Sequence, residues 1–369
     1  MKKQKWSMQK KIVTVIIIIF AIIIVVALAM LGTMYFAAKS MGIGSAEVAD
    51  YDTRIEIWNS AAGNSSDSKL DDMNIGNSKN LMFATMKFAD MIVSETYVDG
   101  EQIIDTFTYL YEIERGFEDE TYEDAPYLIP YLVDDSDSAV IVIPGGGFGY
   151  KSMDGTNGEG KDVALSLNEA GINAFVLHYR TNPYEYPIPY LDLQRAVRYL
   201  RYHADTYHIN PDKISMIGFS AGGNLIATFS NTVMGNNLFP DNYVPDDIDG
   251  VDDSVSAVAM IYPAVSFNFN VPMLFCMFDD ELVRDANTRN ELLSIMDMTE
   301  NFNSSEIRQF IAYGTKDAMV GTGEIEKYIA KAESQNTDIT VVKAEGQDHG
   351  FSQSYYINDF IEWFKACMN

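Results

Sequence analysis

A serine set between glycines is the residue whose type and setting most favour chemistry in this chain. The segment Gly218-Phe219-Ser220-Ala221-Gly222 matches G-x-S-x-G, follows an apolar run and precedes small residues suited to the start of a helix. In a sharp strand-to-helix turn, glycines on both sides avoid clashes and the serine hydroxyl is held out of the sheet at a helix N-terminus. The bare pattern is common by chance, so it is this context that predicts Ser220 as a nucleophile.

A serine hydroxyl reacts well only when a base accepts its proton. The chain has four histidines, of which His349 lies in a loop after the last predicted strand and before the last predicted helix. Loops at strand ends are where catalytic groups gather. We therefore predict His349 as the base, and we expect structural or surface roles for His178, His203 and His208.

The base in turn needs an acid that holds its ring in the correct tautomer, and after such a serine turn the acid precedes the histidine in the chain. Asp317 meets this condition because it lies in the loop after the penultimate predicted strand. Asp348 is adjacent to His349, and neighbouring loop residues rarely point correctly to bond each other's side chains. We predict Asp317 as the acid. Weaker candidates in a later insertion are Asp279, Asp280 and Asp285.

The oxyanion of a tetrahedral intermediate also needs hydrogen-bond donors. A run of glycines in the segment 144–148 follows the first strong strand, and bare backbone N–H groups there can approach a substrate carbonyl. We predict Gly146, Gly147 and Ala221 as the donors, although such a run on its own is equally typical of a plain turn. The loop does not match G-x-G-x-x-G and no G-K-[ST] follows, which disfavours a nucleotide site.

The elements that must position these residues begin near residue 126, where short β-branched runs alternate with segments of helical periodicity. This pattern is typical of an α/β fold with a mostly parallel sheet covered on both faces. The predicted strands are 139–143, 173–178, 213–217, 256–262, 309–313 and 340–343, and the predicted helices are 160–170, 191–207, 221–232, 323–334 and 354–366. Residues 267–302 are rich in Met, Leu and Phe without a strand, which predicts a lid-like insertion above the sheet edge.

Length and charge narrow the class of protein. A chain of 369 residues that is 47% hydrophobic can bury a full core. With 26 Lys and Arg against 53 Asp and Glu, the formal net charge is −27, and such an acidic surface repels nucleic acid, other anionic polymers and anionic lipid headgroups. Cys276 and Cys367 lie far apart and match no metal or haem spacing, so we expect free thiols and neither a metal nor a cofactor. Nothing in the sequence selects an oligomeric state.

The N-terminus carries a long apolar stretch over residues 12–38, and lysines at positions 2, 3, 5, 10 and 11 precede it. As a helix, this stretch is long enough to span a bilayer. By the positive-inside rule, residues 1–11 form a cytoplasmic basic tail and the chain beyond residue 38 lies outside the cell. We predict an uncleaved signal anchor. The alternative is a signal peptide cleaved near Ala27-Leu28-Ala29, which would release a secreted protein.

Between the apolar stretch and the alternating region, residues 39–125 are rich in Ser, Asn, Asp and Gly. This composition predicts a polar stalk with some local structure, including an amphipathic helix over residues 81–93. The predicted layout is therefore a cytoplasmic tail, a transmembrane helix, a stalk, and a catalytic domain over residues 126–369.

The catalytic region resembles the α/β-hydrolase esterases related to hormone-sensitive lipase, and most of all their bacterial branch of small acyl esterases. The likeness covers about residues 126–363. Besides the serine turn it includes the segments Pro144-Gly145-Gly146-Gly147, Glu159-Gly160, Tyr179-Arg180, Pro187-Ile188-Pro189 through Asp192, Arg195-Ala196 and Asn210-Pro211. The chain departs from the lipase branch at Pro144, where that branch has a histidine, and after Asp317, where the usual proline is missing.

The resemblance implies an α/β-hydrolase fold in which Ser220, Asp317 and His349 form the catalytic triad. It also implies hydrolysis of short, acetyl-like acyl esters of small molecules or oligosaccharides, without a cofactor. A peptidase or an acyltransferase on the same fold remains open, as does a catalytically silent surface binding protein. The acyl length and the alcohol part of the substrate are also open.

Overall fold

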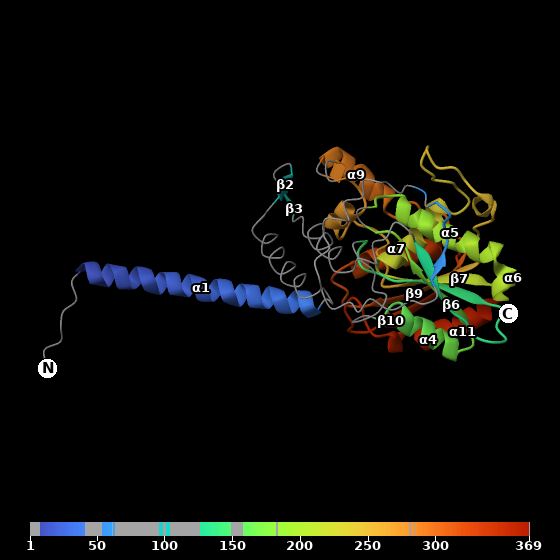
Figure 1. Ribbon diagram of the computed structural model, residues 1–369, viewed down its shortest axis with the longest axis horizontal. Coiled ribbons are helices and arrows are strands. Elements are labelled where there is room, and N and C mark those ends of the chain that lie inside the picture. Colours follow the sequence, from blue (N-terminus) through green and yellow to red (C-terminus); the bar gives the residue numbers. More distant parts are fainter. Residues whose placement is uncertain are drawn as a thin grey trace.

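The computed structural model describes residues 8–40, 54–60, 62, 96–98, 101–103, 126–148, 158–181, 184–279, 282–283 and 285–368. Its first element is α1 (Met8–Ser40), one long helix in Figure 1. Within it, Val13–Gly32 has a mean hydropathy of 3.4, so by length and composition this stretch is able to cross a membrane. Residues 1–7 of the predicted tail and the predicted helix over 81–93 lie outside the described residues. The predicted stalk also contains a short hairpin of β2 (Thr96–Val98) and β3 (Glu101–Ile103).

An eight-stranded sheet forms the centre of the fold (Figure 1). Its strand order is β1-β4-β6-β5-β7-β8-β9-β10, with antiparallel pairing at β1 and β4 and parallel pairing from β6 to β10. The strands are β1 (Ile55–Glu56), β4 (Tyr127–Tyr131), β5 (Ala139–Ile143), β6 (Asn173–His178), β7 (Ile214–Phe219), β8 (Ala257–Ile261), β9 (Arg308–Gly314) and β10 (Ile339–Ala344). The carboxyl ends of the parallel strands meet at one edge, where sites form in open α/β sheets.

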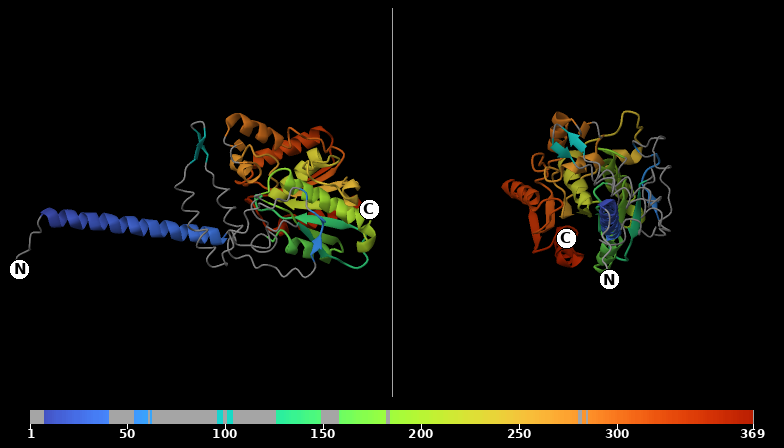
Figure 2. Two further views of the ribbon diagram at one scale, coloured as in Figure 1. Left: turned by 45° about the horizontal axis from the view of Figure 1, so that its top comes forward. Right: turned by 90° about the vertical axis from the view of Figure 1, so that its left-hand side faces the viewer.

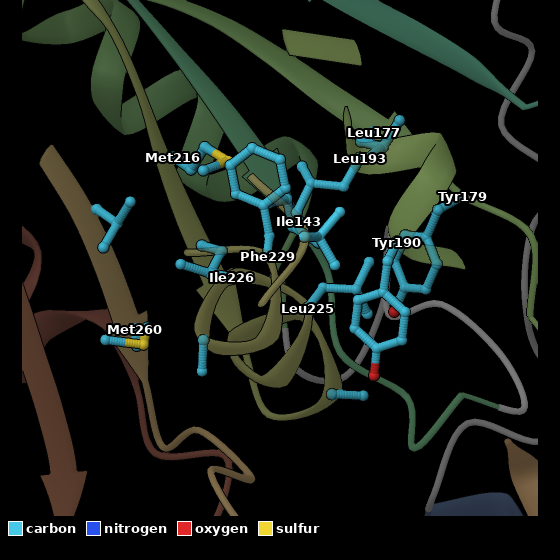
Figure 3. Packing of buried hydrophobic residues seen from close by; sticks show 14 of the residues in the cluster. Ile143, Leu177, Tyr179, Tyr190, Leu193, Met216, Leu225, Ile226, Phe229 and Met260 are labelled. Atoms are coloured by element: carbon cyan, nitrogen blue, oxygen red, sulfur yellow. The ribbon is translucent and has the colours of Figure 1, made fainter. Parts of the chain in front are cut away.

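Helices cover both faces of the sheet (Figure 2). One face carries α4 (Lys161–Glu169) and α11 (Ile357–Met368), and the other carries α5 (Ile188–Tyr202), α6 (Ala204–Tyr207), α7 (Ala221–Thr228) and α10 (Thr322–Ser334). Along β5, Val142 belongs to the first core and Ile143 to the second, because successive strand side chains point to opposite faces. Figure 3 shows the second core, in which Leu225 of α7 lies near Ile143. Burial on both faces is why the strands appear in the sequence as continuous apolar runs.

The predicted α/β architecture is confirmed, and the differences from the predicted elements have local causes. The helix predicted over 191–207 is divided at His203 into α5 and α6, and the one over 221–232 changes after α7 into a π-helical turn, η2 (Phe229–Val233). Strand β4 was not predicted because it contains Pro130, which lacks a ladder donor. It is tolerated where β4 has a single partner strand, since β1 pairs only with Tyr127 and Leu128.

A short segment before β4 packs onto the sheet and its helices, although its sequence suggested a polar stalk. We call residues 54–60 and 62 the N-terminal strap. Ile57 and Trp58 are buried, and the Trp58 indole donates a hydrogen bond to Asp192 Oδ1 (3.0 Å). Arg195 Nε donates to the Ile57 carbonyl (2.6 Å) and Arg180 Nη1 to the Ala62 carbonyl (2.6 Å). The folded unit therefore includes the strap together with the chain that follows residue 126.

The insertion over residues 267–302 contains a 3₁₀ helix, η4 (Val271–Cys276), and α9 (Ala286–Ile295). Its methionines, Met273, Met277, Met296 and Met298, are all buried in the larger core cluster. The Met298 N–H also donates to the Val265 carbonyl (2.9 Å), which ties the end of the insertion to the chain leaving β8. The insertion is thus part of the packed domain, and its methionines fill the core instead of lying free above the sheet.

Candidate active site

Ser220 occupies the turn between β7 and α7 in a backbone conformation that side-chain-bearing residues rarely adopt, with φ 51° and ψ −112°. A Cβ at Gly222 would lie 2.1 Å from the carbonyl oxygen of Ile143, so the close approach of this turn to the end of β5 requires glycine. The Ser220 N–H donates to the Ile261 carbonyl at the end of β8 (3.0 Å). The turn is therefore held from both neighbouring strands.

The three residues predicted as nucleophile, base and acid are in direct contact. His349 Nε2 lies 2.8 Å from Ser220 Oγ, and His349 Nδ1 lies 2.8 Å from Asp317 Oδ2. With its proton on Nδ1, the imidazole donates to Asp317 and accepts from the serine hydroxyl. The Asp317 side chain is fully buried, so water does not compete for this hydrogen bond. This arrangement can move a proton from the hydroxyl to the ring.

The loop after β9 prepares Asp317 for this contact. Its second carboxylate oxygen, Oδ1, accepts hydrogen bonds from the backbone N–H groups of Met319 (2.9 Å) and Val320 (3.1 Å). These bonds fix the carboxylate while leaving Oδ2 to His349.

Asp348 has a different role from the one considered for it in the sequence. Its Oδ1 accepts from the backbone N–H of Ala318 (3.0 Å) and from that of His349 (2.8 Å). These hydrogen bonds lower the pKa of the Asp348 carboxyl below its usual value. Asp348 thus joins the acid loop to the histidine loop. The sequence shows that Asp348 lies beside His349. It does not show that the Asp348 carboxylate accepts a hydrogen bond from the loop after β9, because that contact depends on how the two loops pack.

The predicted oxyanion donors lie on two segments that meet at the serine turn. Ala221 begins α7, so its N–H has no acceptor within that helix. Gly146 and Gly147 have φ values of 130° and 60°, which glycine adopts readily. Their loop is anchored at its start, where the Tyr179 hydroxyl donates to the Pro144 carbonyl (2.8 Å). These N–H groups remain our proposed oxyanion donors.

The other histidines make contacts outside this hydrogen-bonded chain. His178 is buried and stacks on Tyr127 (centroids 4.3 Å apart), His203 lies against Tyr199 (4.3 Å), and His208 ends α6 in a left-handed conformation. Of the insertion's acids, Asp285 caps α9 by accepting from the Thr288 N–H (2.8 Å), Asp279 is exposed, and Asp280 lies outside the described residues. Among the described histidines, His349 alone hydrogen-bonds Ser220.

Comparison with known proteins assigns the chain to a family. The family model BD-FAE matches residues 128–324, more than half of the chain. The chain belongs to the BD-FAE family of α/β-hydrolase esterases. These esterases are carboxylic ester hydrolases, and the confirmed fold agrees with this assignment.

The names of two curated relatives and one solved structure that resemble the chain refer to xylan or a xyloside. An acetylxylan esterase of Xylanibacter ruminicola is 37% identical over 26% of this chain and 19% of its own length. Endo-1,4-beta-xylanase B of Butyrivibrio fibrisolvens is 34% identical over 33% of this chain and 18% of its own. The chain thus spans less than a fifth of either relative. An acetyl ester-xyloside bifunctional hydrolase from Caldicellulosiruptor lactoaceticus has a TM-score of 0.57 and 25% identity, over 66% of this chain and 88% of that one.

Proposed function

We propose that this protein is an esterase that removes short acyl groups from carbohydrates through a covalent acyl-enzyme on Ser220. The observation that carries the proposal is the continuous hydrogen-bonded chain from Ser220 through His349 to buried Asp317, with both links 2.8 Å long. Family membership supplies the reaction class, and the chain of contacts supports the assignment of roles.

In the proposed first step, Ser220 Oγ forms a bond to the acyl carbon while its proton passes to His349 Nε2. The oxyanion is stabilised by the N–H groups of Gly146, Gly147 and Ala221. The imidazolium then donates its proton to the leaving alcohol oxygen as the ester bond breaks. In the second step, water attacks the acyl-enzyme, gives a proton to His349, and the proton returns to Ser220 Oγ as the acid leaves.

Three observations support a short acyl group on a neutral sugar. The names of these relatives refer to acetylxylan, to xylan and to an acetyl ester-xyloside. The methionines of the insertion, which would suit a long acyl channel because Met adapts to irregular apolar ligands, are buried in the core instead. The strongly acidic composition also disfavours anionic lipid surfaces as substrates.

A panel of acetyl esters, acetylated xylo-oligosaccharides and peptide amides tests the proposal. We expect the full chain to release acetate from the esters and to leave the amides intact. By comparison with triad knockouts in general, Ser220→Ala should lower the rate of hydrolysis by at least about 10³-fold. Its thermal unfolding should be unchanged. Activity of Ser220→Ala within about tenfold of the original chain would contradict the role of Ser220. Transfer of the acetyl group to an added sugar in preference to water would identify an acyltransferase.

A chain-length series from acetate to decanoate tests the acyl preference. Each methylene that fits a pocket changes transition-state binding by roughly 1 kcal/mol, so a short pocket gives kcat/KM values that fall steeply beyond a few carbons. A maximum at eight carbons or more would contradict the short-acyl proposal and would assign an acyl channel to the insertion.

We also propose that α1 anchors the protein in the cell membrane with the catalytic domain outside. The lysines before the apolar stretch support this orientation by the positive-inside rule. Protease added to intact cells should digest the catalytic domain. Survival of the domain while a known surface protein is cut would reverse the orientation, and recovery of the domain free in the medium would indicate a cleaved signal peptide.

A further inference from the structure

A buried glutamate outside the hydrogen-bonded chain lies next to it. Glu159 is 2% exposed and directly precedes Gly160, at the start of α4. Its Oε2 accepts the Gly145 N–H (2.7 Å), and its Oε1 accepts the Tyr262 hydroxyl (2.8 Å). The mechanism proposed above makes no use of this carboxylate, whose burial is costly except where hydrogen bonds such as these two compensate for the lost water.

The first contact places Glu159 beside the nucleophile and the glycine loop. A Cβ built on Gly145 would lie 2.9 Å from Glu159 Oε2 and 2.9 Å from Ser220 Cβ. The carboxylate and the serine side chain therefore approach Gly145 from the same side, and no other residue leaves room for both. Because Gly145 directly precedes Gly146, the bond to Glu159 holds the start of the segment that carries the proposed oxyanion donors.

The second contact connects Glu159 to the base. The Tyr262 ring lies edge-on to the imidazole of His349, with centroids 4.9 Å apart. Tyr262 follows β8 with a φ of 37°, and its N–H donates to the Ala312 carbonyl (2.7 Å). With both its backbone and its hydroxyl held, the Tyr262 ring is a fixed wall for the imidazole. Glu159 thus supports the oxyanion loop through one oxygen and the wall beside the base through the other.

The charge of Glu159 acts on the same base. Burial raises the pKa of Glu159, while the Tyr262 hydroxyl, the Gly145 N–H and the charge of His349 act in the opposite direction. Burial, together with the negative charge of Glu159, raises the pKa values of Tyr262, Tyr179 and Tyr356, so these phenols remain neutral. Among the residues that the structure describes, the charged groups that face His349 are Asp317, Asp348 and Glu159, all of them negative when ionised.

We propose that Glu159 is a positioning residue of the ester hydrolase: it fixes the oxyanion loop and the Tyr262 wall, and its negative charge stabilises the imidazolium that forms when Ser220 is deprotonated. The inference rests on the proposed roles of Ser220 and His349. It adds a second carboxylate that acts on the base without touching substrate. Its effect is expected to be electrostatic as well as structural, and the two can be separated by pH.

The experiment measures how fast a fluorophosphonate labels the serine of the full chain in detergent across a range of pH. In labelling, Ser220 Oγ bonds to phosphorus, fluoride leaves, and the hydroxyl proton passes to His349, so the rate reports the nucleophile and its base without any choice of ester. Glu159→Gln keeps the shape and removes the charge. We expect the maximal rate to fall about tenfold, in keeping with the loss of one charged contact to a developing ion.

The pH midpoint distinguishes the electrostatic role from a structural one. Without the negative charge of Glu159, protonated His349 is less stable, so the ring stays neutral to lower pH and the midpoint of the rate profile moves down. A variant that only loosened the loop would lower the rate without moving the midpoint. Glu326→Gln is the matched control, because Glu326 also accepts a tyrosine hydroxyl, that of Tyr313 (2.9 Å), outside this network. It should leave the rate and the midpoint as in the original chain.

The outcomes separate this inference from the proposed function. Labelling that persists in Ser220→Ala overturns both. Labelling that is lost in Ser220→Ala but keeps its original rate and midpoint in Glu159→Gln overturns the role of Glu159 alone, as does a lowered rate with an unmoved midpoint. If Glu159→Gln does not fold, Tyr262→Phe replaces it: the loss of the hydroxyl donor should lower the rate, and unchanged labelling in that variant overturns the proposal.

Discussion

The strap region and the active site both bury charged side chains from distant parts of the chain, but they balance the charges differently. At the strap, Arg180 pairs with Asp192 (2.7 Å) with both side chains almost fully buried, and Arg195 pairs with Asp249 (2.8 Å) and Asp246 (2.6 Å). Each of these three carboxylates accepts hydrogen bonds from a guanidinium. The same two arginines also donate hydrogen bonds to backbone carbonyls of the strap, those of Ala62 and Ile57.

At the active site, the buried carboxylates are held by neutral donors. Asp317 accepts from backbone N–H groups and from His349, and Glu159 accepts from an N–H and a phenol. Among the residues that the structure describes, no Lys or Arg pairs with either carboxylate. The carboxylates of the strap network thus face a permanent cation, whereas the active-site carboxylates gain a neighbouring cation only when His349 becomes an imidazolium. Preorganised charge of this kind stabilises a transition state more than a ground state.

The largest expected effect comes from removing one of these unbalanced charges. Asp317→Asn keeps the shape but cannot accept the Nδ1–H in the same way and favours the wrong tautomer of His349. We expect kcat/KM for a chromogenic acetate to fall by about 10³–10⁴-fold, as in other triads with this change. Thermal unfolding should be nearly unchanged, because Asn can still accept from the Met319 and Val320 N–H groups.

Asp348→Asn is the matched control for this change, since Asp348 lies beside the same histidine but accepts only backbone N–H groups. Its amide oxygen can keep both bonds, so the loss should be about tenfold or less. The reverse ranking, with Asp348→Asn the more damaged variant, would assign the acid role to Asp348.

A change at the strap should have the opposite character, with a large effect on stability and little on chemistry. Trp58→Ala removes a buried indole that contacts Asp192 and lies under Arg195 (4.7 Å to the ring centroid). We expect the free energy of unfolding to fall by about 3 kcal/mol, measured by urea denaturation of the full chain in detergent. The kcat of the folded fraction should be retained. Tyr202→Ala on the exposed side of α5 is the control and should cost less than about 0.5 kcal/mol. A selective loss of kcat in Trp58→Ala would show that the two regions are coupled.

The smallest effect is a pH dependence at the strap. The hydrogen bond from Arg195 lowers the pKa of Asp246 to about 2. Because the pKa is depressed in the folded protein, this stabilisation is present above the ordinary value and is lost as the pH falls from about 4 to about 2. Asp246→Asn, which can still cap the following turn, should be destabilised by about 1 kcal/mol at neutral pH.

The difference in unfolding free energy between Asp246→Asn and the original chain should shrink across that acid range. Asp137→Asn is the control, because Asp137 forms an exposed pair with Lys213 (3.0 Å) that should contribute little. If the difference in unfolding free energy between Asp246→Asn and the original chain stays constant down to pH 2, the pairing with Arg195 does not depend on the charge of Asp246.

The sequence by itself determined the parallel strands of the sheet, its covering helices and the order of Ser220, Asp317 and His349. Strands buried on both faces leave continuous apolar runs, helices leave a period of 3.6 residues, and a serine turn needs glycines at fixed positions. These are local requirements, and each is visible within a few residues of its cause. The apolar stretch of α1 is visible for the same reason. The family assignment follows from the same local segments.

Only the tertiary structure decided what meets across long separations. It placed Glu159 beside Ser220, used Asp348 to join two loops, and bound Trp58 to Asp192 from a segment with the composition of a stalk. It also placed the methionines of the insertion in the hydrophobic core. The physical reason is that a contact between distant residues depends on packing distance and on desolvation. Neither leaves a periodic pattern in the sequence, and the sequence alone does not distinguish a buried glutamate from an exposed one.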